Sequence, residues 1–274
     1  MTIQSPFRSI SSRSSFSPFK RFFPYDFNAA TYIDAVESAD GQLLEPGVKD
    51  AINSFVVGCK TDGIWDAIKA CCILAGARTL NGALVPLVGT APTNYNFVAG
   101  DYNRETGLVG DGSTKYLDSN RANNADPQNS NHNALFISDA NSSDPAILMG
   151  DGTATTIGNN RIVFSTSLSS NFHFDSRSVS GGSITTFPVN PTGFVGHSRS
   201  TSTNALFRVA SSTTSYSMTS ATPTTTNVYV FSRESGGIPT NARLSFYSIG
   251  ESLDLARLDA RVTDLINAIG VAIP

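Results

Sequence analysis

Two kinds of hydrophobic pattern divide the chain. Between about residues 77 and 250, apolar residues occur in short runs, such as 227–232, separated by Gly, Asn, Asp, Ser, Thr and Pro. Strands bounded by turn residues at intervals of roughly 8–12 residues are typical of a β-sandwich or jelly roll. About a dozen such runs favour two stacked sheets that bury alternating apolar residues between them. We therefore predict a mainly β fold over residues 77–274.

Residues 28–76 instead show helical spacing in three short pieces. A first helix is expected from 28 or 29 to 39, with Gly41 as its left-handed cap. A second, over 46–62, opens on a proline, which is pre-set for the first helical position. A third is expected over 64–76. Short helices with apolar faces must pack together or onto the sandwich, so we predict a helical collar.

A closing helix is predicted from Ser252, as N-cap, to Ile269, with Gly270 as its C-terminal cap. Docking of its apolar stripe on the sandwich is the main expectation, and a subunit contact is the alternative. The stripe comprises Leu255, Leu258, Val262, Leu265, Ile266 and Ile269.

Residues 1–27 are expected to form an extended arm, because prolines and serines interrupt any helix there. Either it is a disordered tail or it orders on a partner, and its many phenylalanines favour a partner. We predict an anchoring arm built on its aromatic and basic residues, namely Phe7, Arg8, Arg13, Phe16, Phe19, Lys20, Arg21, Phe22 and Phe23.

Composition narrows the class of partner. Only 15% of residues are charged and the net charge is −3, so the surface is polar but weakly charged. Such a surface suits sugars or protein subunits, and nucleic acid is an unlikely partner. Serines and basic residues interrupt any secretory signal core in residues 1–24, and no stretch approaches the length of a membrane span.

Candidate chemistry is sparse. The two Gly-Asp-Gly segments, at 110–112 and 150–152, are expected to be hairpin turns, with calcium binding as the alternative. The histidines, His132, His173 and His197, are scattered, and His173 should point away from its phenylalanine neighbours. We predict no metal site and no cofactor.

The three cysteines, Cys59, Cys71 and Cys72, lack zinc-site spacing and are expected to be buried thiols. A bridge from Cys59 to one of the other two is the alternative. Glycoside hydrolysis needs two carboxylates on one site, whereas the β region holds only Glu105 and Glu234 as glutamates. We therefore predict no catalytic residues and no enzyme.

Residues 109–118, a glycine-rich turn followed by a Tyr-hydrophobic-Asp strand, resemble the early hairpin of laminin-G and concanavalin A-like lectin domains. Residues 244–250 and the helix after them are similar to the last strand and trailing helix of those domains. The resemblance implies a concanavalin A-like jelly-roll sandwich with a small N-terminal helical region and a C-terminal packed helix. It is more specific for fold than for activity.

The segments 33–36, 59–69, 74–80 and 100–108 together resemble tail-fibre-like proteins of tailed bacteriophages, notably cyanophages. This resemblance implies a virion protein made in the host bacterial cytoplasm. It also implies a homo-oligomer, with a trimer favoured, whose arm contacts other virion proteins. The chain departs from long fibres in having no shaft repeats, so a short fibre tip or a capsid-surface protein is expected.

The resemblance therefore predicts a non-enzymatic tail fibre or receptor-binding component that attaches to host-surface glycan. The alternatives are a capsid decoration or cement protein and a polysaccharide hydrolase. Amide groups in the predicted loops 120–133 and 196–204, together with aromatic platforms, would contact the sugar. The predicted glycan-binding residues are Tyr95, Tyr102, Tyr216, Asn131, His132 and Asn204.

Overall fold

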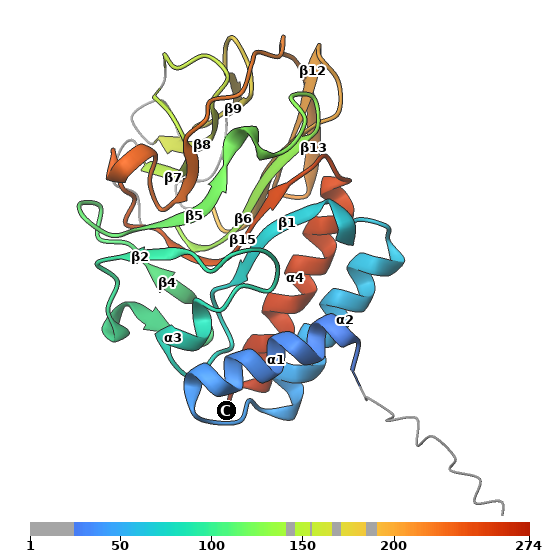
Figure 1. The fold of residues 1–274 in the computed structure, drawn as a ribbon, viewed down its shortest axis with the longest axis vertical. Coiled ribbons are helices and arrows are strands. Elements are labelled where there is room, and N and C mark those ends of the chain that lie inside the picture. Colours follow the sequence, from blue (N-terminus) through green and yellow to red (C-terminus); the bar gives the residue numbers. More distant parts are fainter. Residues whose placement is uncertain (1–24, 141–145, 154, 166–170, 185–190) are drawn as a thin grey trace, which may run out of the picture.

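The computed structural model describes residues 25–140, 146–153, 155–165, 171–184 and 191–274. Two antiparallel sheets stack face to face, and a layer of helices covers the outer face of one of them (Figure 1). The expected mainly β sandwich with N-terminal helices and a packed C-terminal helix is confirmed. The predicted arm residues within 1–24 lie outside the described residues.

Sheet A carries the helices on its outer face. Its strand order is β13-β12-β11-β6-β15-β4-β3, and β1 also pairs with β15. The strands are β1 (Ile68–Ile73), β3 (Tyr102–Asn103), β4 (Gly107–Val109), β6 (Asn131–Asp139), β11 (Gly193–Arg199), β12 (Asn204–Val209), β13 (Ser212–Ser217) and β15 (Arg243–Gly250).

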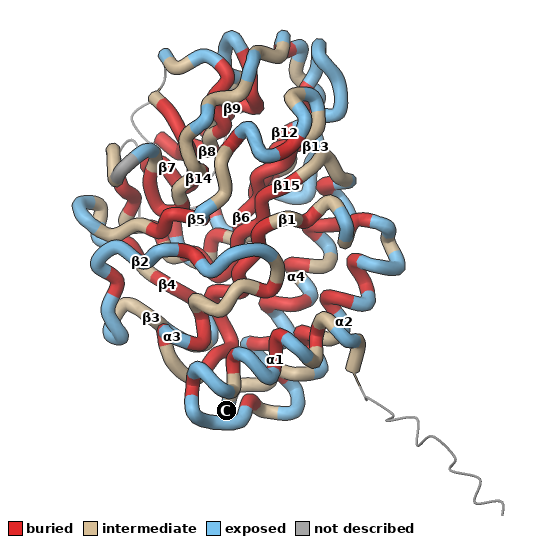
Figure 2. The backbone as a smooth tube through the Cα atoms, in the orientation of Figure 1, coloured by how far each residue is buried: buried red, intermediate tan, exposed pale blue. Residues whose placement is uncertain are grey.

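Sheet B forms the other layer, in the order β10-β9-β8-β7-β14-β5-β2. Its strands are β2 (Thr93–Tyr95), β5 (Tyr116–Ala122), β7 (Ala146–Gly150), β8 (Asn160–Ser165), β9 (Asn171–Ser176), β10 (Gly182–Ile184) and β14 (Asn227–Val230). Alternating side chains of both sheets form the inter-sheet core. Figure 2 marks the buried stretches of the backbone in red. Phe174 of sheet B stacks on Phe207 of sheet A, with ring centroids 4.5 Å apart.

A second hydrophobic core lies between sheet A and the helices α1 (Phe27–Asp40), α2 (Pro46–Thr61) and α4 (Leu255–Ala272). Phe55 of α2 meets Phe246 of β15 edge to face, with ring centroids 5.7 Å apart. Because helices cover one face of sheet A and sheet B covers the other, the central strands of sheet A are buried on both sides. No helix in the described ranges has the length and hydropathy of a membrane span.

The predicted end of the first helix and the predicted start of the second are both confirmed. Gly41 closes α1 with a left-handed φ of 65°, and Pro46 is the first residue of α2. The predicted third helix over 64–76 is wrong. That segment forms a single 3-10 turn, Trp65–Ala67, and then strand β1, which pairs with β15.

The closing helix is shifted from its predicted bounds. Its N-cap is Asp254, whose carboxylate accepts hydrogen bonds from the backbone N–H groups of Ala256 and Arg257. Ser252 precedes the cap, and Gly270 lies inside the helix rather than beyond it. The predicted apolar stripe is buried against the chain's own sheet A and α2, which confirms docking on the sandwich.

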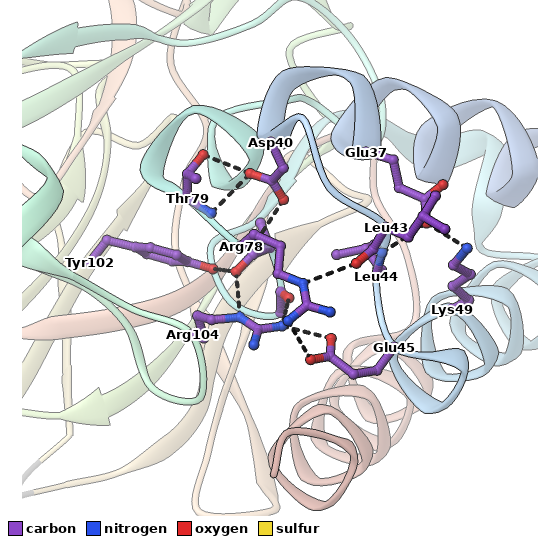
Figure 3. Close-up of polar contacts among 12 residues, drawn as sticks. Glu37, Asp40, Leu43, Leu44, Glu45, Lys49, Arg78, Thr79, Tyr102 and Arg104 are labelled. Atoms are coloured by element: carbon purple, nitrogen blue, oxygen red, sulfur yellow. Dashed lines mark hydrogen bonds and ion pairs between the residues drawn. The ribbon is translucent and has the colours of Figure 1, made fainter.

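A polar cluster joins the helical layer to the sandwich where α1 ends (Figure 3). Glu45 forms ion pairs with Arg78, at 2.8 Å, and with Arg104, at 2.7 Å. Arg104 and the hydroxyl of Tyr102 also donate hydrogen bonds to the carbonyl oxygen of Ala77. These contacts fix the segment after β1 against the loop between α1 and α2. The short helix α3 (Leu80–Ala83) follows directly.

Candidate functional site

The outer face of sheet B carries a group of tyrosines. On β5 and β14, Leu117, Val228 and Val230 are buried in the inter-sheet core. Because side chains alternate across a strand, Tyr116 and Tyr229 project from the opposite face. The neighbouring edge strand β2 places Tyr95 directly across from Tyr116. We call Tyr95, Tyr116 and Tyr229 the tyrosine surface.

The rings of the tyrosine surface contact one another in sequence. Tyr95 stacks on Tyr116 with centroids 4.4 Å apart and an interplanar angle of 12°. Tyr116 meets Tyr229 edge to face at 5.9 Å. Tyr95, at the end of the row, is 39% exposed, whereas the other two are partly buried. The outermost ring is therefore the one most accessible to a ligand.

Polar groups border the rings. Asp118 lies across from both Thr93 and Tyr229 in the strand register. Its carboxylate accepts hydrogen bonds from the side-chain amide of Asn227, at 3.0 and 3.2 Å, and from the backbone N–H of Asn120, at 2.8 Å. Amide, hydroxyl and carboxylate groups can form hydrogen bonds with the hydroxyl groups of a sugar. The neighbouring aromatic rings can stack on the sugar ring.

The loop after β2 holds Tyr95 in place. Asn94 accepts a hydrogen bond from the backbone N–H of Phe97 and donates one to its carbonyl oxygen, both at 3.0 Å. Phe97 itself is buried and packs edge to face on Phe231, 5.0 Å away. The exposed ring is thus carried on a segment that the core anchors.

Gly236 allows a second loop to close over Tyr116. A Cβ atom at this position would lie 2.6 Å from Cε1 of the Tyr116 ring, and the residue has a φ of +83°. Both the close approach and the left-handed backbone favour glycine. Burial, and then the nearby Tyr95, Tyr229 and Asp118, raise the pKa of Tyr116. Its phenol therefore stays protonated and remains a hydrogen-bond donor at neutral pH.

The structure places the three predicted tyrosines at three separate points. Tyr95 belongs to the tyrosine surface on sheet B. Tyr102 lies on β3 at one edge of sheet A, where its hydroxyl donates to the carbonyl oxygen of Ala77. Tyr216 lies on β13 at the opposite edge and packs edge to face on Phe174. Tyr102 and Tyr216 are both partly buried.

The expectation that Asn131 and His132 lie in an exposed loop is wrong. They begin β6 and are fully buried, because sheet A continues to this end of the sandwich. His132 is within 2.6 Å of the carbonyl oxygen of Glu251 and 2.8 Å of the hydroxyl of Ser248. Asn204 is exposed at the start of β12, and the predicted loop from residue 196 is strand β11 as far as Arg199.

The two Gly-Asp-Gly segments and His173 were also singled out in the sequence, and the structure shows where each of them lies. Asp111 accepts three backbone N–H bonds in the connection between β4 and β5, which lie in different sheets, so this segment is not a hairpin. Asp151 is buried in the long connection between β7 and β8. His173 points away from the buried Phe172 and Phe174, as predicted.

The three cysteines are buried free thiols, as predicted. In the part of the chain that the structure describes, no group of three His, Cys, Asp or Glu side chains could hold a metal ion.

Sequence reasoning missed Tyr116, Tyr229 and Asp118. Their signal was present in the alternation of each strand, since the buried Leu117, Val228 and Val230 leave their neighbours on the outer face. What the sequence lacked was the pairing of β2, β5 and β14, which are distant along the chain.

No protein-family model matches the chain, and no curated protein matches it. Solved structures with partial similarity include botulinum neurotoxin type C, at 11% identity and a TM-score of 0.49, covering 73% of this chain and 51% of the other. The sialidase of Trypanosoma rangeli has 8% identity and a TM-score of 0.46, with 73% and 32% covered. The NanB sialidase of Streptococcus pneumoniae has 8% identity and a TM-score of 0.38, with 47% and 23% covered.

The chain thus spans at most about half the length of these proteins. At these TM-scores and identities the similarity concerns part of the fold and supports no inference about activity.

Proposed function

We propose that the chain is a non-catalytic glycan-binding protein and that the tyrosine surface is its binding site. The observation that carries this proposal is the stacked pair of Tyr95 and Tyr116 at an accessible edge of sheet B. Sugar rings have an apolar face of C–H groups that packs on an aromatic ring, and hydroxyl groups at the rim that need hydrogen-bond partners. The exposed ring supplies the first contact, and Asp118, Asn120 and Thr93 lie beside it for the second.

A binding role fits this surface better than hydrolysis. Most glycosidases place two carboxyl groups on either side of the bond that is cleaved. Within β2, β5 and β14, Asp118 is the one acidic residue, and its carboxylate already accepts hydrogen bonds from Asn227 and Asn120. One carboxylate that these donors hold in place can orient a ligand, but it lacks the second carboxylate that hydrolysis needs. It also disfavours anionic sugars, so neutral pyranosides are the expected ligands.

The test is a glycan array probed with the wild type and with two substitutions at one position. Tyr95→Phe keeps the ring and should bind as the wild type does. Tyr95→Ala removes the stacking face and should weaken binding about fivefold, in line with the ~1 kcal/mol that an aromatic contact contributes beyond its buried area. Phe27→Ala, at a 77% exposed aromatic residue on α1, is the matched control and should change nothing.

Two outcomes would contradict this site assignment. One is wild-type affinity in Tyr95→Ala with the fold intact by circular dichroism. The other is no binding of the wild-type protein to any neutral glycan on the array.

Host attachment as part of a virion is the setting that we propose for this binding. It is supported by the sequence resemblance to tail-fibre-like phage proteins. In that setting single weak sites gain strength from avidity in a homo-oligomer, for which a trimer is favoured. Deletion of residues 1–24 should leave glycan binding by the isolated protein unchanged and abolish its incorporation into particles. Normal incorporation of the truncated protein would refute the anchoring role of the arm.

A further inference from the structure

Four polar side chains meet inside the sandwich at one end of sheet A. Asn131 and Asn133 lie on β6, and His197 and Arg199 lie on β11. The strand register pairs Asn131 with Arg199 and Asn133 with His197. All four project into the inter-sheet space, because Leu135 and Val195, on the same faces of the same strands, belong to the inter-sheet core. We call these four residues the interior polar group.

The interior polar group is cut off from solvent. The exposed fraction is 1% for Asn131 and 0% for the other three. Sheet B covers the group from the opposite side, where the ring of Phe174 stacks on His197 and the hydroxyl of Ser176 donates to Oδ1 of Asn131 at 2.9 Å. The group is therefore enclosed between the two sheets.

Several polar atoms of the group have no hydrogen-bond partner in the protein. They are Nδ2 of Asn131, Nδ2 and Oδ1 of Asn133, both ring nitrogens of His197 and Nη2 of Arg199. Leaving a buried polar atom unpaired costs about 1–3 kcal/mol, and native proteins rarely leave several in one place. A small species that supplies hydrogen-bond partners to these atoms would remove this cost.

The charge of the group is also unbalanced. The guanidinium of Arg199 donates to the carbonyl oxygens of Ser176, at 2.6 Å, and Met218, at 2.9 Å, and within the described ranges it forms no ion pair. Burial is the cause of its lowered pKa. Buried charges normally have a partner of opposite sign.

We propose that the interior polar group binds a small monovalent anion, chloride in the cell, between Arg199, Asn131, Asn133 and His197. The unpartnered N–H donors would point at the anion, and its charge would balance that of the guanidinium. A water molecule would satisfy the hydrogen bonds but leave the charge unpaired. This site lies inside the protein and is independent of the tyrosine surface.

Binding at this site also stabilises nearby loops. The same Arg199 guanidinium donates to the carbonyl oxygens of Thr201 and Asn204, which frame the turn between β11 and β12. An anion that fixes this guanidinium would therefore hold the turn as well. Because the anion binds the folded state alone, its concentration should set the stability of the protein.

The first test is thermal unfolding at constant ionic strength, with chloride exchanged for the bulky anion gluconate. We expect the melting temperature of the wild type to rise with chloride. Above the dissociation constant, each tenfold rise in chloride should raise the ratio of folded to unfolded protein about tenfold. Crystals soaked in bromide should show one anomalous scattering peak within hydrogen-bonding distance of Arg199.

Two matched variants each add one negative charge, the first inside the interior polar group and the second outside it. Asn131→Asp keeps the acceptor for Ser176 and adds a fixed negative charge opposite Arg199, so its stability should no longer depend on chloride. Asn124→Asp adds the same charge at an exposed position at this end of the sandwich and should keep the wild-type dependence. If Asn131→Asp fails to fold, the bromide experiment on the wild type decides. Equal stability in chloride and gluconate, or water in place of a bromide peak, would overturn the proposal.

Discussion

The carboxylate of Asp40, at the last residue of α1, accepts hydrogen bonds from both the backbone N–H and the hydroxyl of Thr79, at 2.9 and 2.6 Å. Its second oxygen accepts the backbone N–H of Arg78 at 2.6 Å (Figure 3). Gly82 lies so close that a Cβ there would be 2.2 Å from the carboxylate. A single side chain of the helical layer thus fixes the start of α3 in the sandwich.

Removal of this carboxylate should destabilise the protein. Asp40 is only 8% exposed, and Asp40→Ala would leave three donors without their acceptor. We expect a loss of about 2–4 kcal/mol in the free energy of unfolding, measured by urea denaturation. Asp34→Ala, on the exposed face of the same helix, should cost less than about 0.5 kcal/mol. Equal effects of the two substitutions would contradict this role.

Substitution of Gly236 should damage the tyrosine surface. Gly236→Ala combines a left-handed backbone with a Cβ 2.6 Å from the Tyr116 ring, so we expect a loss of about 1–3 kcal/mol in stability and weaker glycan binding. Gly41→Ala has the same backbone strain but no atom within 4 Å of its Cβ. It should lower stability less and leave binding unchanged, which separates the steric clash from the strain.

Two buried groups should give the stability opposite dependences on pH. Burial raises the pKa of Asp151 from 3.8 to about 7. The unfolded chain loses this proton first as pH rises, so the contribution of Asp151 to stability falls between pH 4 and 7. Burial lowers the pKa of His132 from 6.5 to about 4, so its contribution falls as pH drops through the same range. Each contribution amounts to about 3–4 kcal/mol at most.

The two dependences should separate on substitution. Asp151→Asn should make the protein more stable with rising pH between 4 and 6.5, because His132 then dominates. His132→Gln should produce the opposite slope. Urea midpoints measured at half-unit pH steps check this, and identical slopes in both variants would refute the assignment.

The cysteines should be unreactive in the folded protein. Burial raises the pKa of Cys59 and Cys72 to about 12 and that of Cys71 well above its ordinary value, so almost no thiolate exists at pH 8. A thiol-reactive dye should label none of the three before denaturation and all of them afterwards. Fast labelling of one thiol in the native protein would show that its segment opens locally.

The sequence predicted those elements whose signals are local. Gly41 and Pro46 mark helix ends through their own backbone preferences, and the structure confirms a helix end at each of them. The run 68–73 has no such signal. Because both faces of sheet A are covered, five of its six residues are buried and the alternation of a half-exposed strand is absent. Its partner β15 is remote in sequence, so nothing in the neighbouring residues contradicted the prediction of a helix.

The candidate site was predictable only in part. Tyr95 was predicted to be an aromatic platform for sugar, and the structure shows that its ring is partly exposed. Asn131 and His132 were placed in a loop because the segment 120–133 is rich in polar residues, yet the interior of this end of the sandwich is itself polar. Only the register between β6 and β11 brings those residues inside.

The position of β15 has a consequence for protein synthesis. This strand lies in the middle of sheet A, hydrogen-bonded to β6, β4 and β1, all of which leave the ribosome long before it. Until residues 243–250 emerge, the nascent chain exposes strand edges and apolar surface that have no partner, which is the state that chaperones recognise and that aggregates most readily. A translation stop before Arg243 should therefore yield insoluble product rather than a shortened sandwich.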